Sequence, residues 1–321
     1  MVITMYRPAY LELLVTGELD KRIEKLYQIL ESCELCPRRC HKNRLSGERG
    51  YCGAGAQLIV SSYHPHFGEE APLVGGSRGL FSTDGFGLTP SSGSGTIFLT
   101  NCNLLCVYCQ NYDISHLGEG REVAIDEAVA MMLALQNRGC HNINLVTPTH
   151  YAPQLVKAIK LAATGGLHLP VVWNCGGYEN IEVIKLLDGI IDIYMPDIKY
   201  GNGGAAKRYS DAQDYFDRCK EAVREMHRQV GDLRLNQRGI AYRGLLIRHL
   251  VLPGGLARTK KVLDFIASEI SKSSYVNIMD QYRPAGEAYD YPELNRYPSR
   301  QELVEAQKMA KELGLTRLDE K

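Results

Sequence analysis

The feature that most constrains the fold is a regular alternation of short apolar runs and amphipathic helices that begins at residue 96. Apolar runs of this kind are typical of strands buried on both faces of a parallel sheet. They occupy 96–100, 143–147, 171–174, 191–195, 244–251 and 275–279. Parallel strands joined through helices form right-handed crossovers. A closed eight-unit barrel needs ~250 residues, so the sequence predicts an α/β fold with a partial (β/α)6 TIM-like barrel.

Four segments of different composition make up the chain. Residues 1–60 are predicted to be a helical, cysteine-rich N-terminal extension, and 61–95 a loop region rich in Gly, Ser and Pro. The barrel is expected to cover 96–285, and 286–321 to form a C-terminal segment. A helix is predicted to begin there near Ser299, which has a glutamate three residues later, as in a capping box.

The loop region contains a short polar stretch, His64-Pro-His66-Phe-Gly-Glu69-Glu70. Two histidines and two carboxylates could bind a metal. Loops carry such residues for solubility as well, and we favour a solvated or capping loop here. Its position before the first barrel strand would let it cover the mouth of the barrel.

Charge and apolar content exclude several classes of protein. Lys and Arg number 37, as do Asp and Glu, so the formal net charge is zero. This balance argues against nucleic-acid or anionic-membrane binding, which needs a concentrated basic field. No stretch approaches the ~20 apolar residues that span a bilayer. The first residues do not resemble a signal peptide, so we expect a cytoplasmic protein whose 10 cysteines are reduced or bind metal.

Three cysteines directly follow the first predicted strand. Cys102, Cys106 and Cys109 have the spacing C-x₃-C-x₂-C, and thiolates are the usual ligands of iron–sulfur clusters. Three ligands leave one iron of a cubane without a protein ligand, and an open position distinguishes catalytic from structural metal sites. Loops after barrel strands are also where barrel active sites form. The alternatives are three buried cysteines or a zinc site completed by a distant histidine.

The segment Cys102-x₃-Cys106-Val-Tyr108-Cys109 after a first barrel strand resembles the radical S-adenosylmethionine (SAM) superfamily. The segments 195–199 (MPDIK) and 278–284 (IMDQYRP) resemble its uncharacterised branch related to pyruvate formate-lyase-activating enzymes. The resemblance implies a [4Fe–4S] cluster on the three cysteines, with SAM bound at the open iron. It also implies an electron donor such as flavodoxin or ferredoxin, and reductive cleavage of SAM to a 5′-deoxyadenosyl radical that abstracts hydrogen.

The same resemblance suggests where SAM would bind, beginning beside Tyr108. Many relatives have Gly-Gly-Glu after the second strand, whereas this chain has a Thr- and Pro-containing turn. The hydroxyls of Thr147 or Thr149, or backbone carbonyls, would accept hydrogen bonds from the methionine amino group; alternatively the turn contacts no ligand. Asn174 is a candidate for the ribose or methionine end. Arg248 lies in an apolar strand, where an unpaired charge is costly, so we assign it to the methionine carboxylate, with a structural ion pair as the alternative.

Two further polar positions lie at the predicted barrel mouth. Asp197 and Lys199 follow the fourth strand, where a charged pair is either catalytic or a structural salt bridge. His249 should point to the opposite face of its strand from Arg248 and form packed hydrogen bonds rather than bind a ligand.

A second cysteine group precedes the barrel. Cys33, Cys36, Cys40 and Cys52 form a set of four thiols, and four ligands close the coordination of a metal. Structural zinc and an auxiliary iron–sulfur cluster both fit this spacing, and we slightly favour the cluster. Reduced thiols in a small subdomain are the remaining alternative.

Three functions are compatible with these motifs. The leading hypothesis is a radical SAM enzyme that modifies a protein or peptide, as glycyl-radical activators do. The second is a radical SAM enzyme for a small-molecule biosynthetic substrate. The third is a non-catalytic iron–sulfur carrier, which the open-site motif on a barrel disfavours because a carrier needs no substrate cavity.

Overall fold

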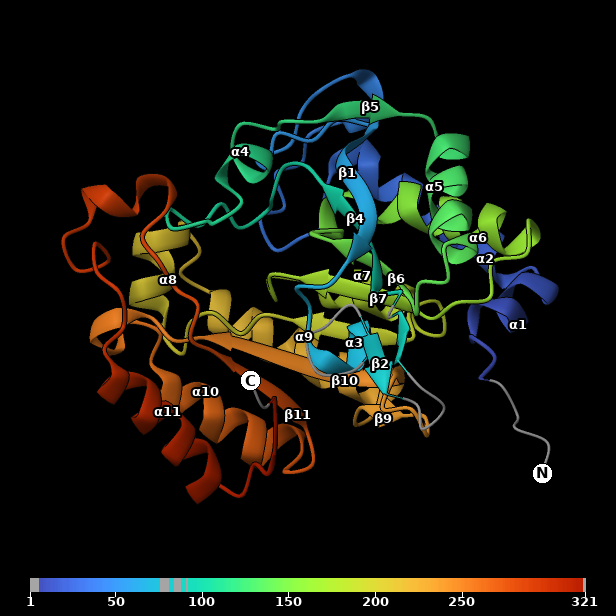
Figure 1. Cartoon of the computed structure of the whole chain (residues 1–321). Helices are drawn as coiled ribbons and strands as arrows, with labels where there is room; N and C mark the ends of the chain where they lie inside the picture. The colour runs from blue at the N-terminus through green and yellow to red at the C-terminus, as the bar shows by residue number, and fades with distance from the viewer. Residues whose placement is uncertain (1–5, 76–80, 84–87, 91, 320–321) are drawn as a thin grey trace.

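The computed structural model describes residues 6–75, 81–83, 88–90 and 92–319 of the 321-residue chain. Each of the six apolar runs forms a strand, and these strands pair in parallel in chain order (Figure 1). They are β4 (Ser94–Leu99), β6 (Ile143–Val146), β7 (Val171–Cys175), β8 (Ile193–Pro196), β10 (Ala241–Leu250) and β11 (Tyr275–Met279). The sheet runs from β12 (Arg317–Leu318) at one edge to β5 (Arg121–Val123) at the other without closing. The predicted α/β fold with a partial TIM-like barrel is therefore confirmed.

Helices between the strands cover one face of this curved sheet. They are α5 (Ile125–Asn137), α6 (Ala152–Thr164), α7 (Ile181–Leu186), α8 (Gly203–Ser210), α9 (Tyr215–Val230) and α10 (Thr259–Phe265). The core is formed by apolar helix faces against the strands, and Trp173 of β7 is completely buried within it. Shorter elements are α4 (Tyr112–Ser115), β9 (Arg234–Leu235), the π-helix Ile266–Ile270, and the 3₁₀ turns Arg44–Ser46, Thr149–Tyr151, Pro253–Gly255 and Gly286–Asp290.

The N-terminal extension begins with two helices, α1 (Tyr10–Val15) and α2 (Glu18–Gln28), followed by a 3₁₀ turn at Ile29–Ser32. Gly17 separates the helices because its φ of 71° is left-handed, a conformation that glycine adopts readily. Both helices pack against α6 of the barrel. The cysteine-rich segment therefore begins on an element that is fixed to the barrel.

The region 61–95, which the sequence predicts to be loop, contains regular structure. β1 (Leu58–His66) pairs antiparallel with β4 and β5. The hairpin β2 (Phe81–Thr83) and β3 (Leu88–Pro90) follows α3 (Ala71–Val74). β1 escapes prediction because only its first half is buried, whereas its second half is polar, contains a proline and lies at the sheet edge. The barrel sheet is thus extended by an antiparallel strand.

α3 lies inside the partial barrel. Its Leu73 is completely buried in an apolar cluster with inward-facing residues of three strands, namely Val172, Ile193, Met195, Ala241 and Leu246. The carbonyl of Leu73 accepts a hydrogen bond from the side chain of Asn142, 3.0 Å away. This packing brings Glu69 and Glu70, immediately before α3, into the interior. The expectation of a solvated loop is therefore wrong for these two residues, because the apolar sequence Ala-Pro-Leu-Val behind them is buried in the barrel.

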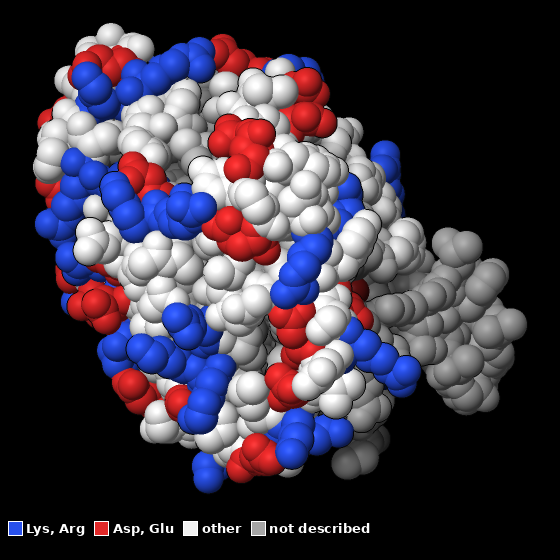
Figure 2. All heavy atoms as spheres, turned by 90° about the vertical axis from the view of Figure 1, so that its left-hand side faces the viewer, with Lys and Arg blue, Asp and Glu red and all other residues white. Residues whose placement is uncertain are grey.

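The C-terminal segment follows the prediction. α11 (Arg300–Glu312) begins at Ser299, and Ser299 and Glu302 form both hydrogen bonds of a capping box. After α11, β12 pairs in parallel with β11. The face that carries α4, α8 and α11 has basic and acidic side chains interspersed (Figure 2). Among the described residues, no helix has the length and apolar character needed to cross a membrane.

Candidate functional site

A cavity of about 250 Å³ lies at the C-terminal ends of the parallel strands. All six strands contribute to its wall, through Leu99, Val146, Asn174, Asp197, Leu250 and Met279 at or just beyond their ends. Successive parallel strands direct their carboxyl ends to the same edge of the sheet, so residues far apart in sequence meet here. We call this the cluster cavity, because the cysteine loop after β4 forms its remaining wall.

Cys102, Cys106 and Cys109 all line the cluster cavity. The loop folds tightly because Asn101 and Leu105 have left-handed φ angles of 66° and 49°. It is anchored at two points: the Asn101 amide donates to the carbonyl of Ile114 at 2.8 Å, and the Val107 amide to Tyr209 at 2.9 Å. The three cysteines thus share one cavity wall beyond the first strand, and their role as a common metal site stays a prediction.

Burial changes the pKa of two of these thiols. It raises the pKa of Cys102 to about 12, and it raises the pKa of Cys106 although the Lys199 ammonium opposes the shift. The sulfur of Cys102 accepts from the backbone amide of Leu104 at 3.4 Å, and that of Cys109 from the Ser115 hydroxyl at 3.2 Å. Hydrogen bonds of this kind stabilise sulfur that carries negative charge.

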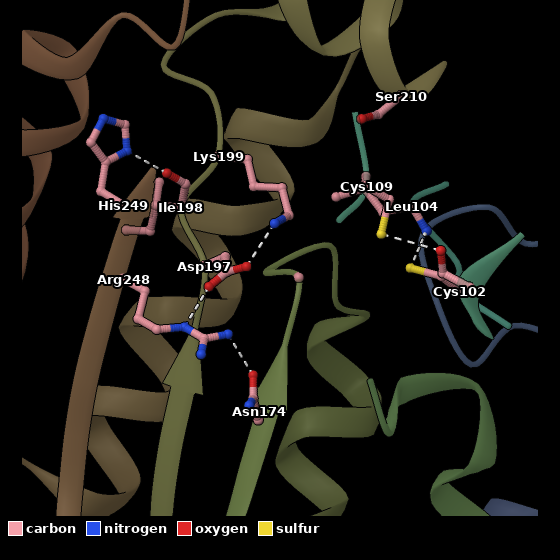
Figure 3. Close-up of polar contacts among 12 residues, drawn as sticks. Cys102, Leu104, Cys109, Asn174, Asp197, Ile198, Lys199, Ser210, Arg248 and His249 are labelled. Carbon is pink, nitrogen blue, oxygen red and sulfur yellow. Dashed lines mark hydrogen bonds and ion pairs between the residues drawn. The ribbon is translucent and has the colours of Figure 1, made fainter. Parts of the chain in front are cut away.

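Within the described residues, no group of three His, Cys, Asp or Glu side chains is arranged to hold a metal ion. The donor chemistry nevertheless suits an iron–sulfur cluster, which takes one soft thiolate on each of three irons. Cys102, Cys106 and Cys109 line this cavity and would hold such a cluster. The polar residues Asn174, Asp197 and Arg248 lie across from Cys102 and Cys109 (Figure 3).

Tyr108 is 3% exposed and lines the cluster cavity. Its ring packs edge-on against Tyr200 and Tyr282, with centroids 6.2 and 5.8 Å away. Among the described residues, its hydroxyl has no hydrogen bond of normal geometry, and burial, with a smaller effect of the neighbouring Tyr200, raises its pKa. Buried hydroxyls are usually paired, so the Tyr108 hydroxyl is available to a ligand of this cavity.

The structure separates the two threonines predicted to contact the methionine amino group. Thr147 lines the cluster cavity, with a left-handed φ of 60° and its amide bonded to the carbonyl of Asn174 at 2.8 Å. Thr149 is completely buried outside it, and its hydroxyl donates to Glu179 at 2.6 Å. Thr149 is thus corrected to a residue of the turn: the 3₁₀ turn after β6 directs it toward α7 rather than into the cavity.

A network of charged side chains forms the wall opposite the cysteines (Figure 3). Arg248 donates from Nε to Asp197 at 2.7 Å and from Nη2 to the amide oxygen of Asn174 at 2.6 Å. Lys199 donates to the other oxygen of Asp197, also at 2.6 Å. The two cations hold the pKa of Asp197 low against the opposing effect of burial. All four residues line the cluster cavity.

This network changes the interpretation of Arg248. We assigned it to the carboxylate of bound methionine, but the chain itself provides a carboxylate, that of Asp197. The structural ion pair considered as the alternative is what the structure contains. Because Arg248 occupies the oxygen of Asn174, the amide nitrogen of Asn174 remains as a hydrogen-bond donor in the cluster cavity.

Glu69 is a fifth member of the network, and the sequence analysis did not place it there. Its carboxylate lies 3.5 Å from Nη1 of Arg248 and accepts a hydrogen bond from Asn144 at 2.9 Å. Burial raises the pKa of Glu69 to about 7, although the Arg248 charge opposes the shift. The signal that could have revealed it is the pair of adjacent glutamates directly before a buried apolar turn.

His249 has the structural role predicted for it. Nδ1 lies 2.6 Å from the carbonyl of Ile198 and Nε2 lies 3.0 Å from the hydroxyl of Thr259. Burial lowers its pKa to about 4, so the ring is neutral at physiological pH. It holds the segment after β8 against α10, on the opposite side of β10 from Arg248 (Figure 3).

A buried arginine, Arg44, contacts one of the four N-terminal cysteines, Cys33. Sulfur atoms of Cys40 and Cys52 converge on Gly50, each 3.4 Å from the position that a Cβ would take there. Arg44 is completely buried, with Nη1 3.8 Å from the sulfur of Cys33 and its other donors on the carbonyl of Gly55. No carboxylate among the described residues lies within ion-pair distance of Arg44, and Cys33 is the cysteine whose sulfur it contacts.

The N-terminal extension also supports the catalytic loop. Arg38 donates to the backbone carbonyls of Asn103 and Leu104, at 3.0 and 3.4 Å. Gly53 packs so closely on Asn101 that a Cβ would lie 2.9 Å from its side-chain oxygen. The segment that carries the N-terminal cysteines therefore contacts the residues on both sides of Cys102.

Comparisons with known proteins agree with this geometry. The family model of the radical SAM superfamily matches residues 96–237, which include the cysteine loop and the strands from β4 to β8. Two relatives come from Methanocaldococcus jannaschii. The uncharacterized protein MJ0674 is 31% identical over 318 residues, covering 95% of this chain and 82% of the relative. The uncharacterized protein MJ0808 is 26% identical over 205 residues, covering 62% and 59%.

Among solved structures, HydG, a maturase of the [FeFe]-hydrogenase, matches with a TM-score of 0.47 and 15% identity. The match covers 68% of this chain and 49% of the maturase. The family model and the long alignment to MJ0674 cover the strands and the cysteine loop that build the cluster cavity. The chain belongs to the radical SAM superfamily, and it is a radical SAM enzyme.

Proposed function

We propose that Cys102, Cys106 and Cys109 hold a [4Fe–4S] cluster and that SAM binds beside it in the cluster cavity. The superfamily implies both cofactors, and together they supply reductive cleavage of SAM to a 5′-deoxyadenosyl radical for hydrogen abstraction. The observation that carries the proposal is that three thiols from one loop line the same cavity as polar residues from three strand ends. Flavodoxin or ferredoxin is the class of electron donor that such an enzyme uses.

The residues opposite the cysteines would bind and orient SAM. The amide nitrogen of Asn174 and the hydroxyl of Thr147 at this wall can bond to a ligand, as can the hydroxyl of Tyr108 in the cysteine loop. Arg248 acts indirectly, since its bond to Asn174 fixes which way that amide points. Apolar residues such as Leu99 and Leu250 complete the wall and exclude water from the site of radical chemistry.

For the substrate we propose a protein or peptide, as for pyruvate formate-lyase-activating enzymes. Support comes from the segments 195–199 and 278–284, which resemble that branch and lie at the ends of β8 and β11 beside the cluster cavity. A small-molecule substrate is the second candidate. It is favoured by a neighbouring cavity of about 370 Å³, which is of the size that encloses small ligands.

We also propose that Cys33, Cys36, Cys40 and Cys52 bind a second metal centre, an iron–sulfur cluster or zinc. The buried guanidinium of Arg44 supports this, because it has no carboxylate partner among the described residues and a buried charge needs compensation. Four metal-bound thiolates would provide that negative charge.

The test of the main proposal is an assay for 5′-deoxyadenosine with reduced, anaerobically reconstituted protein. Wild-type protein should release 5′-deoxyadenosine and methionine from SAM, and the triple variant Cys102→Ala/Cys106→Ala/Cys109→Ala should release none. Cys140→Ala is the matched control, since Cys140 is buried but lies outside the cavity. Activity in the triple variant would refute the site. A wild-type protein that holds the cluster without cleaving SAM would instead support an iron–sulfur carrier.

A further inference from the structure

A second cavity, of about 370 Å³, adjoins the cluster cavity. It lies between the segment before α3 and the ends of β10 and β11. Arg248, Met279 and Gln281 line both cavities, so a molecule in the second one would be separated from the first only by these side chains. We call it the acidic cavity, because Glu69, Glu70 and Asp319 are among its lining residues.

The acidic cavity contains buried hydrogen-bond acceptors without donors. Glu70 is 5% exposed; its Oε1 accepts from the side-chain amide of Asn277 at 2.8 Å, whereas its Oε2 has no partner among the described residues. Asn277 is 7% exposed, and no described residue donates to its amide oxygen. Leaving such groups buried and unsatisfied costs about 1–3 kcal/mol each. Both unpartnered atoms are acceptors, so a ligand that satisfies them must donate hydrogen bonds.

The balance of charge points to a cation. Arg248 is engaged by Asp197 at 2.7 Å and faces Glu69 at 3.5 Å, and Lys199 is bound to the far oxygen of Asp197. No lysine or arginine nitrogen of the described part of the chain lies within ion-pair distance of Glu70. Arg248 and Lys199 thus form their ion pairs with Asp197 and Glu69, and Glu70 is the carboxylate of this group without an ion pair among the described residues.

We propose that the acidic cavity is the substrate chamber and that it binds an ammonium group through Glu70 and Asn277. An ammonium donates three hydrogen bonds and carries the compensating charge. The group would belong to a small amine or to a lysine side chain of a peptide. A substrate anchored here could extend past Met279 and Gln281 toward the cluster cavity. This inference rests on the proposed function and adds the chemical class of its substrate.

The test measures binding to the cluster-loaded enzyme in the presence of SAM. The probes are 1,5-diaminopentane with its neutral counterpart 1,5-pentanediol, and a lysine-containing peptide with its Nε-acetylated form. Isothermal titration should detect a charged probe and not its neutral partner. Saturation by the diamine alone identifies a small-amine chamber, and saturation by the lysine peptide identifies a peptide site. Equal binding of charged and neutral probes, or binding of none, would overturn the inference.

Variants locate the effect. Glu70→Gln keeps the shape and the acceptor for Asn277 but removes the charge, and should weaken binding of the charged probe by about tenfold or more. Its melting temperature should stay the same or rise, because it relieves an unpaired buried charge, whereas loss of a structural ion pair would lower it. Asn277→Ala should weaken binding in the same direction, and the exposed Glu119→Gln should not. Unchanged affinity in Glu70→Gln would refute the proposal.

Measuring SAM cleavage without substrate distinguishes a failure of the proposed function from a failure of the proposed ammonium site. If the wild-type enzyme cannot form 5′-deoxyadenosine, the proposed function fails. If it forms 5′-deoxyadenosine but binds no amine, the proposed function stands and the acidic cavity is not an ammonium site. The Glu70→Gln variant should retain this basal cleavage, since Glu70 does not line the cluster cavity.

Discussion

Replacing Arg248 by methionine removes the charge that holds the network together while keeping an apolar side chain of similar length. The structure gives the guanidinium bonds to Asp197 at 2.7 Å and Asn174 at 2.6 Å, and a contact with Glu69 at 3.5 Å. Its loss leaves Asp197 with Lys199 alone and deprives Glu69 of its only described cation. Breaking a buried pair on one side costs about 3–5 kcal/mol. At roughly 2 °C per kcal/mol for a chain of this size, the melting temperature should fall by about 6–10 °C.

The assay is a double-mutant cycle by thermal or denaturant unfolding, with Arg248→Met, Asp197→Asn and the double variant. The losses in unfolding free energy of the two single variants should add up to about 1–3 kcal/mol more than the loss in the double variant, because the two residues are in direct contact. Arg243→Met is the control on the same strand, since its guanidinium donates to the carbonyl of Gln229. A loss below about 1 kcal/mol in Arg248→Met, together with weaker SAM binding, would refute this reasoning and restore Arg248 as a direct cofactor ligand.

Three other predictions test the site more briefly. Burial raises the pKa of Glu179 to about 7, above the ~4.3 of an unfolded chain, so its contribution to stability is present below pH 4 and lost as pH rises through 7. The free energy of unfolding should therefore fall less between pH 5 and 8 in Glu179→Gln than in wild type. The exposed control Glu24→Gln should behave like wild type, and an equal pH dependence in Glu179→Gln and wild type would contradict the prediction. Metal analysis of the triple cysteine variant should find iron with sulfide, or about one zinc, per chain. Adding Cys36→Ser to this variant should remove the bound metal. If the triple variant already contains no metal, the N-terminal cysteines are ordinary thiols. In Gly177→Ala the new Cβ would lie 2.4 Å from the carbonyl of Asp197 at a φ of 76°, so stability should fall by more than about 1 kcal/mol, and an unchanged melting temperature would show that the turn can relax.

Much of the fold could be predicted because its signals are local. The runs at 171–174 and 275–279 have one polar residue each, an asparagine, and this is typical of short strands covered on both faces. The helix after Ser299 has its start specified by residues three apart. β1 could not be predicted in this way because half of it is exposed, and its place is fixed by pairing with β4 and β5.

In the candidate site, too, some features could be predicted from the sequence and others depend on the tertiary structure. The sequence determined the three-cysteine loop, since the three cysteines lie within eight residues and their spacing alone indicates the radical SAM superfamily. Tertiary structure decided which side chains face it. Thr147 and Thr149 are two residues apart, yet only Thr147 lines the cavity, because the intervening turn directs Thr149 to Glu179.

The charged interior shows the physical reason most clearly. An arginine in an apolar strand indicates that a carboxylate will be its partner. The sequence does not identify that carboxylate, because any nearby negative charge can satisfy the electrostatic requirement. Asp197 lies 51 residues away and Glu69 lies 179 residues away, and both reach Arg248 only when the strands align and α3 enters the barrel. The sequence by itself determined that this chain carries a radical SAM cysteine loop on a partial barrel. Only the packing of distant segments decided that two glutamates would lie inside it.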